Sequence, residues 1–589
     1  MLNQESTPFT TRDDRRLFIL SSLATAAFVT LVFRLFYLQV VCGSDMARRA
    51  EMNSTQILPL LAPRGLVYAR DGAGEEVLLD NAPRFSLFYA HNPKGSVPLE
   101  KMEKELASRL PHAGAALIRK MGEARKSGKM TRILTNIPRE TALALMERRI
   151  FLPGVNVLVE PQRRARYGQL ACHLLGYAGE VDEGELRRAR DQALRPGQWV
   201  GKNGLEKMYD PDLRGTDGGL QFEMDAAGRH VQVVRRIPSV PGADIHLTLD
   251  RRLQSVAEAG LGGSSTGRGA AVALDPRTGA VLAFASAPGY DPSQNLGDYL
   301  GDPDLPFFNR ALQGIYPPGS IFKIVTAAAV LKDTTWNTRQ SILCTGSYDL
   351  GTKKFGCWKR HGVLDFFGAV AWSCNVYFYN LGRTAGPDSI ETYAKAFGFG
   401  EKSGLDLPGE SPGLVPGRDW KRRIQKQGWY EGDTLNFCIG QGAMTATPLQ
   451  AAVLLAAIAN GGTVWRPYAV SHAVGPDKKI LYRREPEARR RVVLDERVWS
   501  ILHRALEGVV TQGSGRGVYR PDLVIGAKTG TAQNPHGEDH SWFSAYAGRP
   551  GEPAGLALAV FVENGGQGSV AAGPIAKAMI EAYYPRPTP

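Results

Sequence analysis

The stretch YPPGSIFKIV, residues 316–325, sets Ser320 and Lys323 three positions apart at the start of an apolar helical pattern. The Pro-Pro-Gly turn ends an extended segment, so Ser320 is predicted at a helix N-terminus, where free N–H groups favour negative charge. Residues three apart project from the same side of a helix. A lysine whose pKa is lowered by partial burial can activate a serine as a nucleophile. The stretch alone fits an ordinary capping serine equally well.

Two later motifs decide between these interpretations. SCN (373–375) lies in WSCNVYFYN, and KTGT (528–531) lies in LVIGAKTGTAQ, on a predicted strand. Ser-x-x-Lys, Ser-x-Asn and Lys-Thr-Gly in this order form the signature set of penicillin-binding proteins and serine β-lactamases. Three motifs in order, each on a suitable element, leave coincidence a poor explanation.

The pattern around the motifs predicts an α+β domain with one antiparallel sheet flanked by helices. Asp250 is expected to cap a helix that Gly262-Gly263 ends, after a strand with alternating apolar positions. The expected elements are a strand at 244–250, a hairpin at 269–275 and 279–286, three sequential strands at 523–533, 540–548 and 555–565, and a final helix at 574–584. The third motif therefore falls on the first of the three last strands.

The N-terminal region predicts a membrane anchor. Residues 17–33 carry no charge, and the apolar run resumes after Arg34 and continues to Val41. As a helix, these 25 residues would span roughly 37 Å, enough to cross a bilayer. Basic residues precede the segment (Arg12, Arg15 and Arg16), which places residues 1–16 in the cytoplasm. A cleaved signal peptide would need small residues before the cut, and residues 39–41 are not small.

Length and charge leave room for two domains beyond the anchor. The chain has 589 residues and a net charge of +13, which suits a membrane surface or an anionic polymer as well as a basic surface without a specific ligand. No nucleic-acid-binding signature is present, so no nucleic-acid partner is expected. We assign residues 42–245 to an elongated, non-catalytic α/β pedestal and residues 246–589 to the catalytic domain.

The six cysteines do not form a disulfide framework. Cys344, Cys357 and His361 lie close enough in sequence to pair or to share a metal, and Cys374 falls inside the SCN motif. The Cys-x12-Cys spacing is not a standard zinc-ribbon pattern. A disulfide, a zinc site and unlinked residues all remain open, so no metal ligand and no cofactor is assigned.

The chain resembles a class B penicillin-binding protein, most closely the elongation-type penicillin-binding protein 2, over most of its length. APRGLVYARDG (62–72) is similar to the family's segment just outside the membrane, although Ala69 and Asp71 depart from its usual residues. GLEKMYDPDLRGTDG (204–218) resembles a stretch of the family's pedestal. SCNVYFY, GQGAMTATPLQ (440–450) and the HSWF that follows KTGTAQ favour the elongation branch over the division branch.

The resemblance implies acyl transfer at a D-Ala-D-Ala stem peptide, with Ser320 as nucleophile and Lys323 as base. Ser373 would relay a proton toward the leaving amine, and Asn375 would hold Lys323 and the substrate amide. Lys528 would attract the substrate carboxylate. Thr529, Gly530 and Thr531 are the expected substrate-binding residues, Gly530 by leaving room for the substrate backbone. The backbone N–H groups of Ser320 and Thr531 would form the oxyanion hole. His540 and Trp542 are expected to border the cleft, with core packing as the alternative for Trp542, and Gln441 to help shape it.

The resemblance also implies partners and a location. It predicts a single-pass protein of the bacterial inner membrane with a periplasmic catalytic domain, acting on peptidoglycan during cell elongation and inhibited by β-lactams. A SEDS-type glycosyltransferase, RodA, and an MreC-type activator are the expected protein partners. The alternatives are a division-type transpeptidase and, with less support, a D,D-carboxypeptidase or β-lactam sensor.

Overall fold

The computed structural model describes residues 11–42, 55–90, 98–110, 114–127, 130–148, 150–188, 194–195, 197–224, 230–535 and 537–586. The predicted tail at 1–16 therefore lies largely outside the described residues. The chain divides into two compact units that are interleaved in sequence. One unit holds Met1–Leu61, Pro83–Glu160 and Asp217–Ser239, and the other holds Ala62–Ala82, Pro161–Thr216 and Val240–Pro589. The linear boundary expected at 245 stays a prediction.

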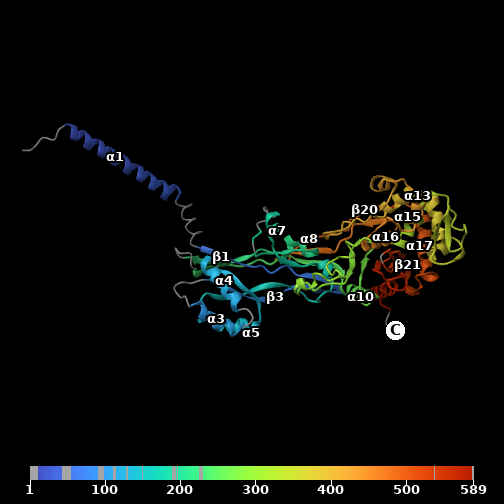
Figure 1. The fold of residues 1–589 in the computed structure, drawn as a ribbon, viewed down its shortest axis with the longest axis horizontal. Coiled ribbons are helices and arrows are strands. Elements are labelled where there is room, and N and C mark those ends of the chain that lie inside the picture. The colour runs from blue at the N-terminus through green and yellow to red at the C-terminus, as the bar shows by residue number, and fades with distance from the viewer. Residues whose placement is uncertain are drawn as a thin grey trace, which may run out of the picture. The chain divides into compact units, whose positions relative to one another are not determined.

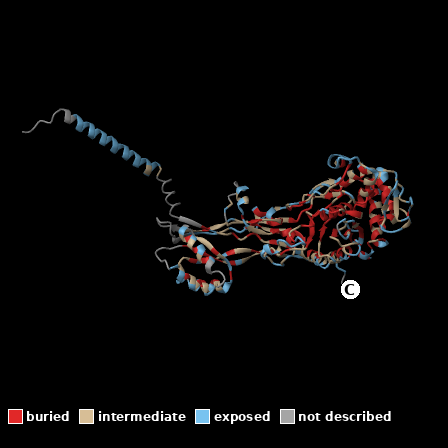
Figure 2. Cartoon of the chain, in the orientation of Figure 1, coloured by how far each residue is buried: buried red, intermediate tan, exposed pale blue. Residues whose placement is uncertain are grey.

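The N-terminal segment is one long helix, α1 (Thr11–Phe36), continued by a wider turn at Tyr37–Val41. Its side chains from residue 15 to residue 36 are exposed, as the pale blue ribbon in Figure 2 shows. The stretch Arg15–Val41 is long enough and apolar enough to cross a membrane, and it is the only such helix in the described part of the chain. The exposed apolar surface agrees with the predicted span at 17–41.

The first unit packs helices and strands around a small core. Its elements are β1 (Thr55–Leu60), α3 (Leu99–Ala107), α4 (Gly114–Ser127), β4 (Thr131–Ile137), α5 (Arg139–Glu147), β8 (Gly218–Met224) and β9 (His230–Ile237). Apolar residues at helical spacing, such as Met102 and Leu106 on α3 and Leu117 and Met121 on α4, meet in this core. Strands β1, β8 and β9 form an antiparallel sheet of their own. Strands β3 (Gly74–Tyr89) and β5 (Val155–Ala165) each have one end in this unit and the other end in the second unit.

The second unit begins with a mixed sheet built from distant parts of the chain. Strand β10 (Asp244–Asp250) lies between β2 (Val67–Asp71), to which it is parallel, and β18 (Val470–Val474), to which it is antiparallel. Strand β19 (Ile480–Arg483) continues the sheet beyond β18. The predicted strand at 244–250 is thus confirmed, but it pairs with strands that no local pattern connects to it.

A buried arginine–carboxylate cluster, formed by Arg64, Arg163, Glu206 and Asp210, lies in this unit. Arg64 contacts Glu206 at 2.6 Å and Asp210 at 2.8 Å, and Arg163 contacts Glu206 at 2.6 Å. Its carboxylates come from two short helices, α8 (Gly204–Met208) and α9 (Asp210–Leu213). Four further short elements precede these helices in the sequence: α6 (Cys172–Leu175), β6 (Ala178–Glu180), α7 (Glu183–Arg188) and β7 (Trp199–Gly201). Arg214, which is partly exposed, also donates to Asp210, from Nε at 2.9 Å, so each buried carboxylate of the cluster is paired with arginine.

The part of the second unit that carries the three sequence motifs is organised by a five-stranded antiparallel sheet with the order β12-β11-β23-β22-β21. Its strands are β11 (Gly269–Leu274), β12 (Val281–Ala287), β21 (Val524–Ala532), β22 (His540–Gly548) and β23 (Leu556–Val562). The hairpin and the three sequential strands are therefore confirmed. In register, Gly269 pairs with Val562, so the first strands close onto the last one.

Both faces of this sheet are buried, and alternate residues of one strand enter two different cores. Ala271 and Ala273 of β11 face helices α10 (Arg251–Gly262) and α18 (Ala572–Tyr583). Ala270 and Val272 face the larger core, which holds α11 (Lys323–Asp333), α13 (Asn375–Ala396) and α16 (Pro448–Ala459). In Figure 2 the buried residues, drawn in red, are concentrated in this region.

Shorter elements complete the unit, and Figure 1 shows helices α13, α15, α16 and α17 grouped near β21. The helices are α12 (Phe366–Ala371), α14 (Arg418–Trp420), α15 (Glu431–Phe437) and α17 (Glu496–Thr511), with short turns at Leu296–Tyr299, Gly319–Phe322, Lys421–Gln425 and Arg516–Val518. The remaining strands form two-stranded sheets: β13 (Ile342–Cys344) with β16 (Gly362–Leu364), β14 (Ser347–Leu350) with β15 (Lys353–Gly356), and β17 (Thr463–Trp465) with β20 (Ala488–Arg491).

Candidate active site

Ser320 lies in a 3₁₀ turn, Gly319–Phe322, directly before α11. Gly319 has φ +52°, and a Cβ atom there would stand 2.9 Å from the Thr531 carbonyl oxygen. Only glycine therefore lets the serine segment approach β21 so closely. Ser320 is half-buried and lines a cavity of about 570 Å³. Thr529, Gly530 and Thr531 line the same cavity.

Lys323 begins α11 and is buried, with 1% of its surface exposed. Its Nζ donates to Asn375 Oδ1 at 2.6 Å and to the carbonyl oxygen of Ser373 at 2.8 Å, and it lies 3.3 Å from Ser373 Oγ. Burial lowers the pKa of Lys323 to about 8. The structure thus brings the first two motifs together. Among the described residues, the hydrogen bonds of Lys323 Nζ all go to the SCN segment and none reaches Ser320.

Lys528 approaches the same serine from β21. Its Nζ donates to Ser373 Oγ at 2.8 Å and to the Thr529 carbonyl oxygen at 2.9 Å. Burial, and then the neighbouring charge of Lys323, lower the pKa of Lys528 well below its ordinary value. No carboxylate within the described residues lies within 4.0 Å of either ammonium nitrogen.

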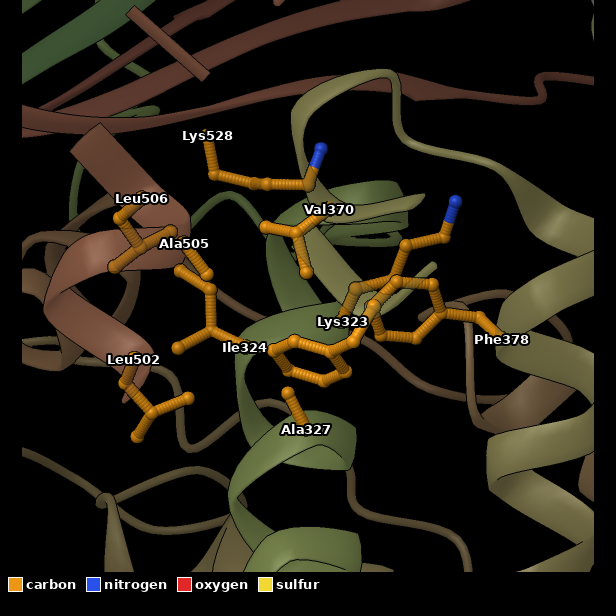
Figure 3. Close-up of a pocket in the computed structure, with 10 residues that line it drawn as sticks. Lys323, Ile324, Ala327, Val370, Phe378, Leu502, Ala505, Leu506 and Lys528 are labelled. Carbon is orange, nitrogen blue, oxygen red and sulfur yellow. The ribbon is translucent and has the colours of Figure 1, made fainter. Parts of the chain in front are cut away.

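Figure 3 shows the two lysine chains over an apolar floor. The side chains below them include Ile324, Leu502 and Leu506, and the void between them has a volume of about 10 Å³. A space of that size holds about one water molecule. The apolar floor excludes bulk water from the stems of both lysines, and this burial is the cause of their lowered pKa values.

Ser373 follows α12 and has φ +55°, the left-handed conformation that usually goes to glycine at a helix end. A non-glycine residue in this conformation costs about 1–2 kcal/mol. The conformation aims the hydroxyl at both lysines. Backbone strain of this kind concentrates at functional sites.

Thr529, Gly530 and Thr531 of the third motif make different contacts. Thr529 Oγ1 lies 2.7 Å from Ser514 Oγ, and Thr531 Oγ1 accepts from the Gly568 N–H at 3.4 Å. A Cβ atom on Gly530 would stand 2.9 Å from Trp542 Cβ and 3.2 Å from Ile321 Cγ1. Gly530 is therefore also needed for packing between the strand and the serine segment, beyond the room for substrate that the sequence suggested.

Neighbouring residues include one that the sequence did not reveal. Ser514 lines the cavity and bonds to Thr529, but it comes from the loop after α17, where only a glycine-rich run, GSG (513–515), marks it. Trp542 is fully buried, and its Nε1 donates to the Pro317 carbonyl oxygen at 3.1 Å. It belongs to the core under the serine segment, the alternative stated for it. Gln441 lines the cavity, as expected.

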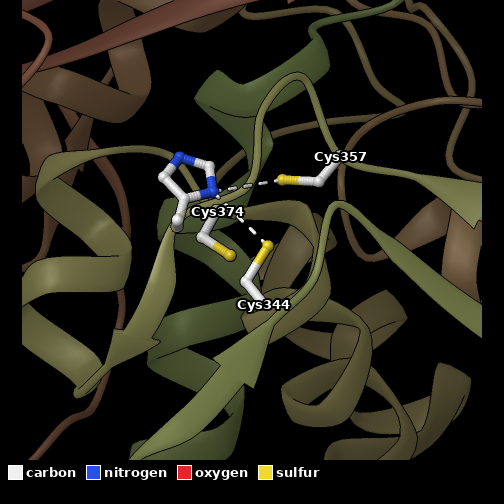
Figure 4. Close-up of side chains that lie close together, drawn as sticks. Cys344, Cys357 and Cys374 are labelled. Atoms are coloured by element: carbon white, nitrogen blue, oxygen red, sulfur yellow. Dashed lines mark hydrogen bonds between the residues drawn. The ribbon is translucent and has the colours of Figure 1, made fainter.

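A cluster of sulfur and nitrogen atoms lies beside the SCN segment. The donor atoms of Cys344, Cys357, His361 and Cys374 all lie within 4.8 Å of one another. His361 Nδ1 is 3.5 Å from the sulfur atoms of both Cys344 and Cys357, the contacts dashed in Figure 4. Cys357 Sγ also accepts from the backbone N–H of Asn375 at 3.2 Å. The cluster is thus joined directly to the second motif.

A serine on a turn at a helix start, with two buried lysines and a hydroxyl between them at a sheet edge, defines the class of serine acyltransferases that recognise penicillin. The family models agree: residues 269–581 match the penicillin binding protein transpeptidase domain, and residues 59–247 match the penicillin-binding protein dimerisation domain. The chain belongs to the class B penicillin-binding proteins, in the branch of the elongation-type penicillin-binding protein 2.

Relatives of known identity support this placement along the whole chain. The peptidoglycan D,D-transpeptidase MrdA of Acinetobacter baumannii is 32% identical over 95% of this chain and 86% of its own length. A penicillin-binding protein 2 from Helicobacter pylori, solved in complex with MreC, superposes with a TM-score of 0.75 at 26% identity, covering 90% of this chain and 99% of the other. A chain of a peptidoglycan synthase complex, described as coordinating polymerization and crosslinking, gives a TM-score of 0.71 at 28% identity, covering 97% and 99%.

Proposed function

We propose that this protein is a peptidoglycan D,D-transpeptidase that cross-links stem peptides during cell elongation through an acyl-enzyme at Ser320. The observation that carries the proposal is the convergence of Lys323 and Lys528 on Ser373 Oγ, at distances of 3.3 and 2.8 Å, because Ser373 lines the same cavity as Ser320. That arrangement supplies a nucleophile and, beside the same cavity, a hydroxyl in contact with a base of lowered pKa.

In acylation, Ser320 Oγ attacks the carbonyl carbon of the penultimate D-Ala and its proton passes to Lys323. The carbon–nitrogen bond to the terminal D-Ala then breaks. A hydroxyl has one proton to donate and two lone pairs to accept with. Because both lysines donate to Ser373 Oγ, its own proton remains available for the leaving amine, and Lys323 passes the proton taken from Ser320 on to Ser373. Thr529, Thr531 and Lys528 bind the terminal carboxylate, whose negative charge favours the ammonium form of Lys528 when the substrate is bound. The N–H groups of Ser320 and Thr531 receive the oxyanion.

In the second half of the reaction, an amine of a neighbouring stem peptide attacks the acyl carbon. The new amide bond forms the cross-link, the bond to Ser320 Oγ breaks, and the proton of the amine returns to Ser320. A β-lactam replaces the donor peptide and stays attached to Ser320.

The location and the partners follow from the family and from α1. We infer a single-pass anchor in the cytoplasmic membrane with the N-terminus inside and the catalytic domain outside, because Arg15 and Arg16 precede the apolar stretch. We infer an MreC-type activator as a partner because one structural relative was solved in complex with MreC. We infer a RodA-type glycosyltransferase because another relative belongs to a peptidoglycan synthase complex that coordinates polymerization and crosslinking. The class B architecture lacks a polymerase, so glycan strands have to come from a partner.

Labelling with a fluorescent penicillin tests the nucleophile. Wild-type protein and a control variant at the surface serine Ser389→Ala should label equally, and Ser320→Ala should not label while keeping its thermal midpoint. Labelling of Ser320→Ala would remove Ser320 from the mechanism. If the wild type instead releases D-Ala from pentapeptide rapidly without any acceptor amine, the activity is that of a D,D-carboxypeptidase.

The sulfur–nitrogen cluster fits a structural zinc ion held by Cys344, Cys357, His361 and Cys374. Tetrahedral zinc, with bonds of about 2.3 Å to sulfur and 2.0–2.1 Å to nitrogen, separates its S and N ligands by about 3.6 Å. The observed separations are 3.5 Å. One histidine nitrogen cannot hydrogen-bond fully to two sulfur atoms, whereas a shared metal satisfies all of them. A zinc ion in four protein ligands supplies no reaction step; it would fix the segment that carries Ser373 and Asn375.

Metal analysis of the purified protein tests this ligand set. One zinc ion per chain is expected in the wild type and in the control variant Cys42→Ser, and less than a tenth of that in Cys357→Ser. Equal zinc content in Cys357→Ser and the wild type would exclude these ligands.

A further inference from the structure

Two exposed tryptophans stand at one side of the active-site cavity with a lysine between them. We call Trp358, Lys359 and Trp372 the tryptophan rim. Lys359 Nζ lies 4.6 Å from the ring centre of Trp358 and 4.2 Å from that of Trp372. Trp358 Nε1 donates to the Trp372 carbonyl oxygen at 3.1 Å, which ties the two residues together. The exposed fractions are 54% for Trp358 and 36% for Trp372. Large aromatic surface left open beside a cleft indicates a binding function.

The rim belongs to a wall of unneutralised positive charge. Strand β15 begins with a basic pair, Lys353 and Lys354, and Arg360 follows Lys359. Within the described residues, none of these four cations has a carboxylate within 4.0 Å, and Asp349, which faces Lys354 in register, makes no ion pair with it. Lys354 and Trp358 both line the cavity that holds Ser320. This wall therefore suits an anionic peptide that can also cover an aromatic ring.

The position of the rim indicates which peptide it meets. Trp372 directly precedes Ser373, and the next residue back, Ala371, accepts from Ser514 Oγ at 3.2 Å. Ser514 in turn bonds to Thr529 at 2.7 Å. Hydrogen bonds thus connect the rim to Thr529, one of the residues proposed above to bind the carboxylate of the terminal D-Ala. Once that residue leaves, the acceptor amine has to reach the acyl carbon from the same end.

We propose that the tryptophan rim, together with Lys354, is the binding subsite for the acceptor stem peptide, an anionic peptide with a free amine. A carboxylate of the acceptor pairs with Lys359 and Lys354, and its aliphatic chain lies on the Trp358 indole. Binding there brings the amine to the acyl carbon; the amide bond forms, the ester bond to Ser320 breaks, and the amine proton goes to Ser320 Oγ. This inference rests on the proposed transpeptidase function and adds to it where the acceptor binds.

Separate measurement of the two half-reactions tests the subsite on the full-length protein in detergent. Acylation is followed with a fluorescent penicillin. Transfer is followed with an amine-blocked peptide ending in D-Ala-D-Ala as donor and an amine-bearing tripeptide with a free carboxylate as acceptor. In Trp358→Ala and Lys359→Glu, the acylation rate should stay within twofold of wild type and the kcat of transfer within threefold. The KM for the acceptor should rise at least tenfold.

Controls separate binding from structure and from net charge. Lys402→Glu carries the same charge change on an exposed lysine elsewhere and should leave the acceptor KM unchanged. Amidation of the acceptor carboxylate should raise its KM in the wild type and make that KM insensitive to Lys359→Glu. Because Trp358 adjoins Cys357, zinc content is measured in each variant. If Trp358→Ala binds less zinc or fails to fold, the acceptor KM is measured in Trp358→Phe and Lys359→Glu instead.

Two results would overturn the proposal. One is an unchanged acceptor KM in Lys359→Glu. The other is a parallel fall in acylation and transfer, which would mean that the rim supports the nucleophile instead of the acceptor. A wild-type protein that penicillin fails to acylate would contradict the proposed function itself, and the acylation assay detects that outcome separately.

Discussion

The two active-site lysines and the arginine–carboxylate cluster are both buried, but only the arginines have carboxylate partners. Lys323 and Lys528 leave at most 1% of their surfaces exposed and face hydroxyl, amide and carbonyl oxygens. In the cluster, Glu206 is fully buried and receives two arginines. The paired carboxylates and arginines hold the fold together, whereas an amine that is buried without a carboxylate has a lowered pKa and can act as a base. The first arrangement serves chemistry, and the second serves structure.

The largest expected effect comes from removing one of these buried amines. Lys323→Met should lower the rate of penicillin acylation about 10³-fold, within the usual range for a general base. Its thermal midpoint should stay level or rise, because an apolar chain replaces a buried amine. Lys332→Met, about two and a half turns later on α11, removes only a surface ion pair with Asp495 and is the control. It should leave the acylation rate unchanged and cost less than about 1 kcal/mol of stability. A large loss of stability in Lys323→Met would show that the lysine is structural.

Breaking the arginine–carboxylate cluster should give the opposite result. Glu206→Gln leaves two buried arginines short of a charge and should destabilise the protein by about 3–5 kcal/mol. Urea denaturation measures the loss, and the folded fraction should be acylated at the wild-type rate. Glu183→Gln, which removes an exposed ion pair with Arg187, should cost less than about 1 kcal/mol.

Glu258 offers an acid for comparison. Burial raises its pKa to about 7, although Gln254 and the Ala171 N–H donate to it. A raised pKa means that the folded state favours the protonated acid, so this stabilisation is complete below about pH 4.5 and is lost as the pH rises through about 7. Relative to Glu258→Gln, the wild type should therefore lose up to about 3 kcal/mol between pH 4.5 and pH 8. Urea midpoints of both proteins across this range test the sign, and parallel curves would contradict it.

The smallest expected effect concerns the backbone at Ser373. Ser373→Gly and Ser373→Ala both remove the hydroxyl and should slow acylation to a similar extent. Glycine accepts φ +55° freely, so Ser373→Gly should be more stable than Ser373→Ala by about 1 kcal/mol. Equal urea midpoints would mean that the conformation carries no strain.

The sequence predicted the parts of this site that residue identity determines, and missed those that depend on the local path of the backbone. Three motifs in order located Ser320, Ser373 and Lys528, and alternating apolar residues located the sheet strands. The prediction that Lys323 lies on the same side as Ser320 stays a prediction. What the sequence did not show is that Lys323 Nζ hydrogen-bonds to the SCN segment, which no local pattern connects to α11.

Other features depended on contacts between distant segments. Ser514 meets Thr529 only because the loop after α17 returns to β21. The pairing of β10 with β2 joins strands from opposite ends of the dimerisation region, and no periodicity encodes that choice. The cysteines and His361 could be found in the sequence. That their donor atoms lie close together became clear only from the structure, in which residues 342–364 pack against the SCN segment.

The pairing of β11 with β23 has a consequence for how the protein is made. Gly269 of β11 pairs with Val562 of β23, the central strand of the sheet, so β11 has no partner on that side until nearly the whole chain has been synthesised. Pairings this distant close slowly because a long loop must be ordered first. During that interval both edges of β11–β12 are open to chaperones and proteases. A premature stop before residue 556 would leave Ser320, Lys323 and Lys528 in the chain. The truncated chain would nevertheless lack β23 and could not complete its sheet.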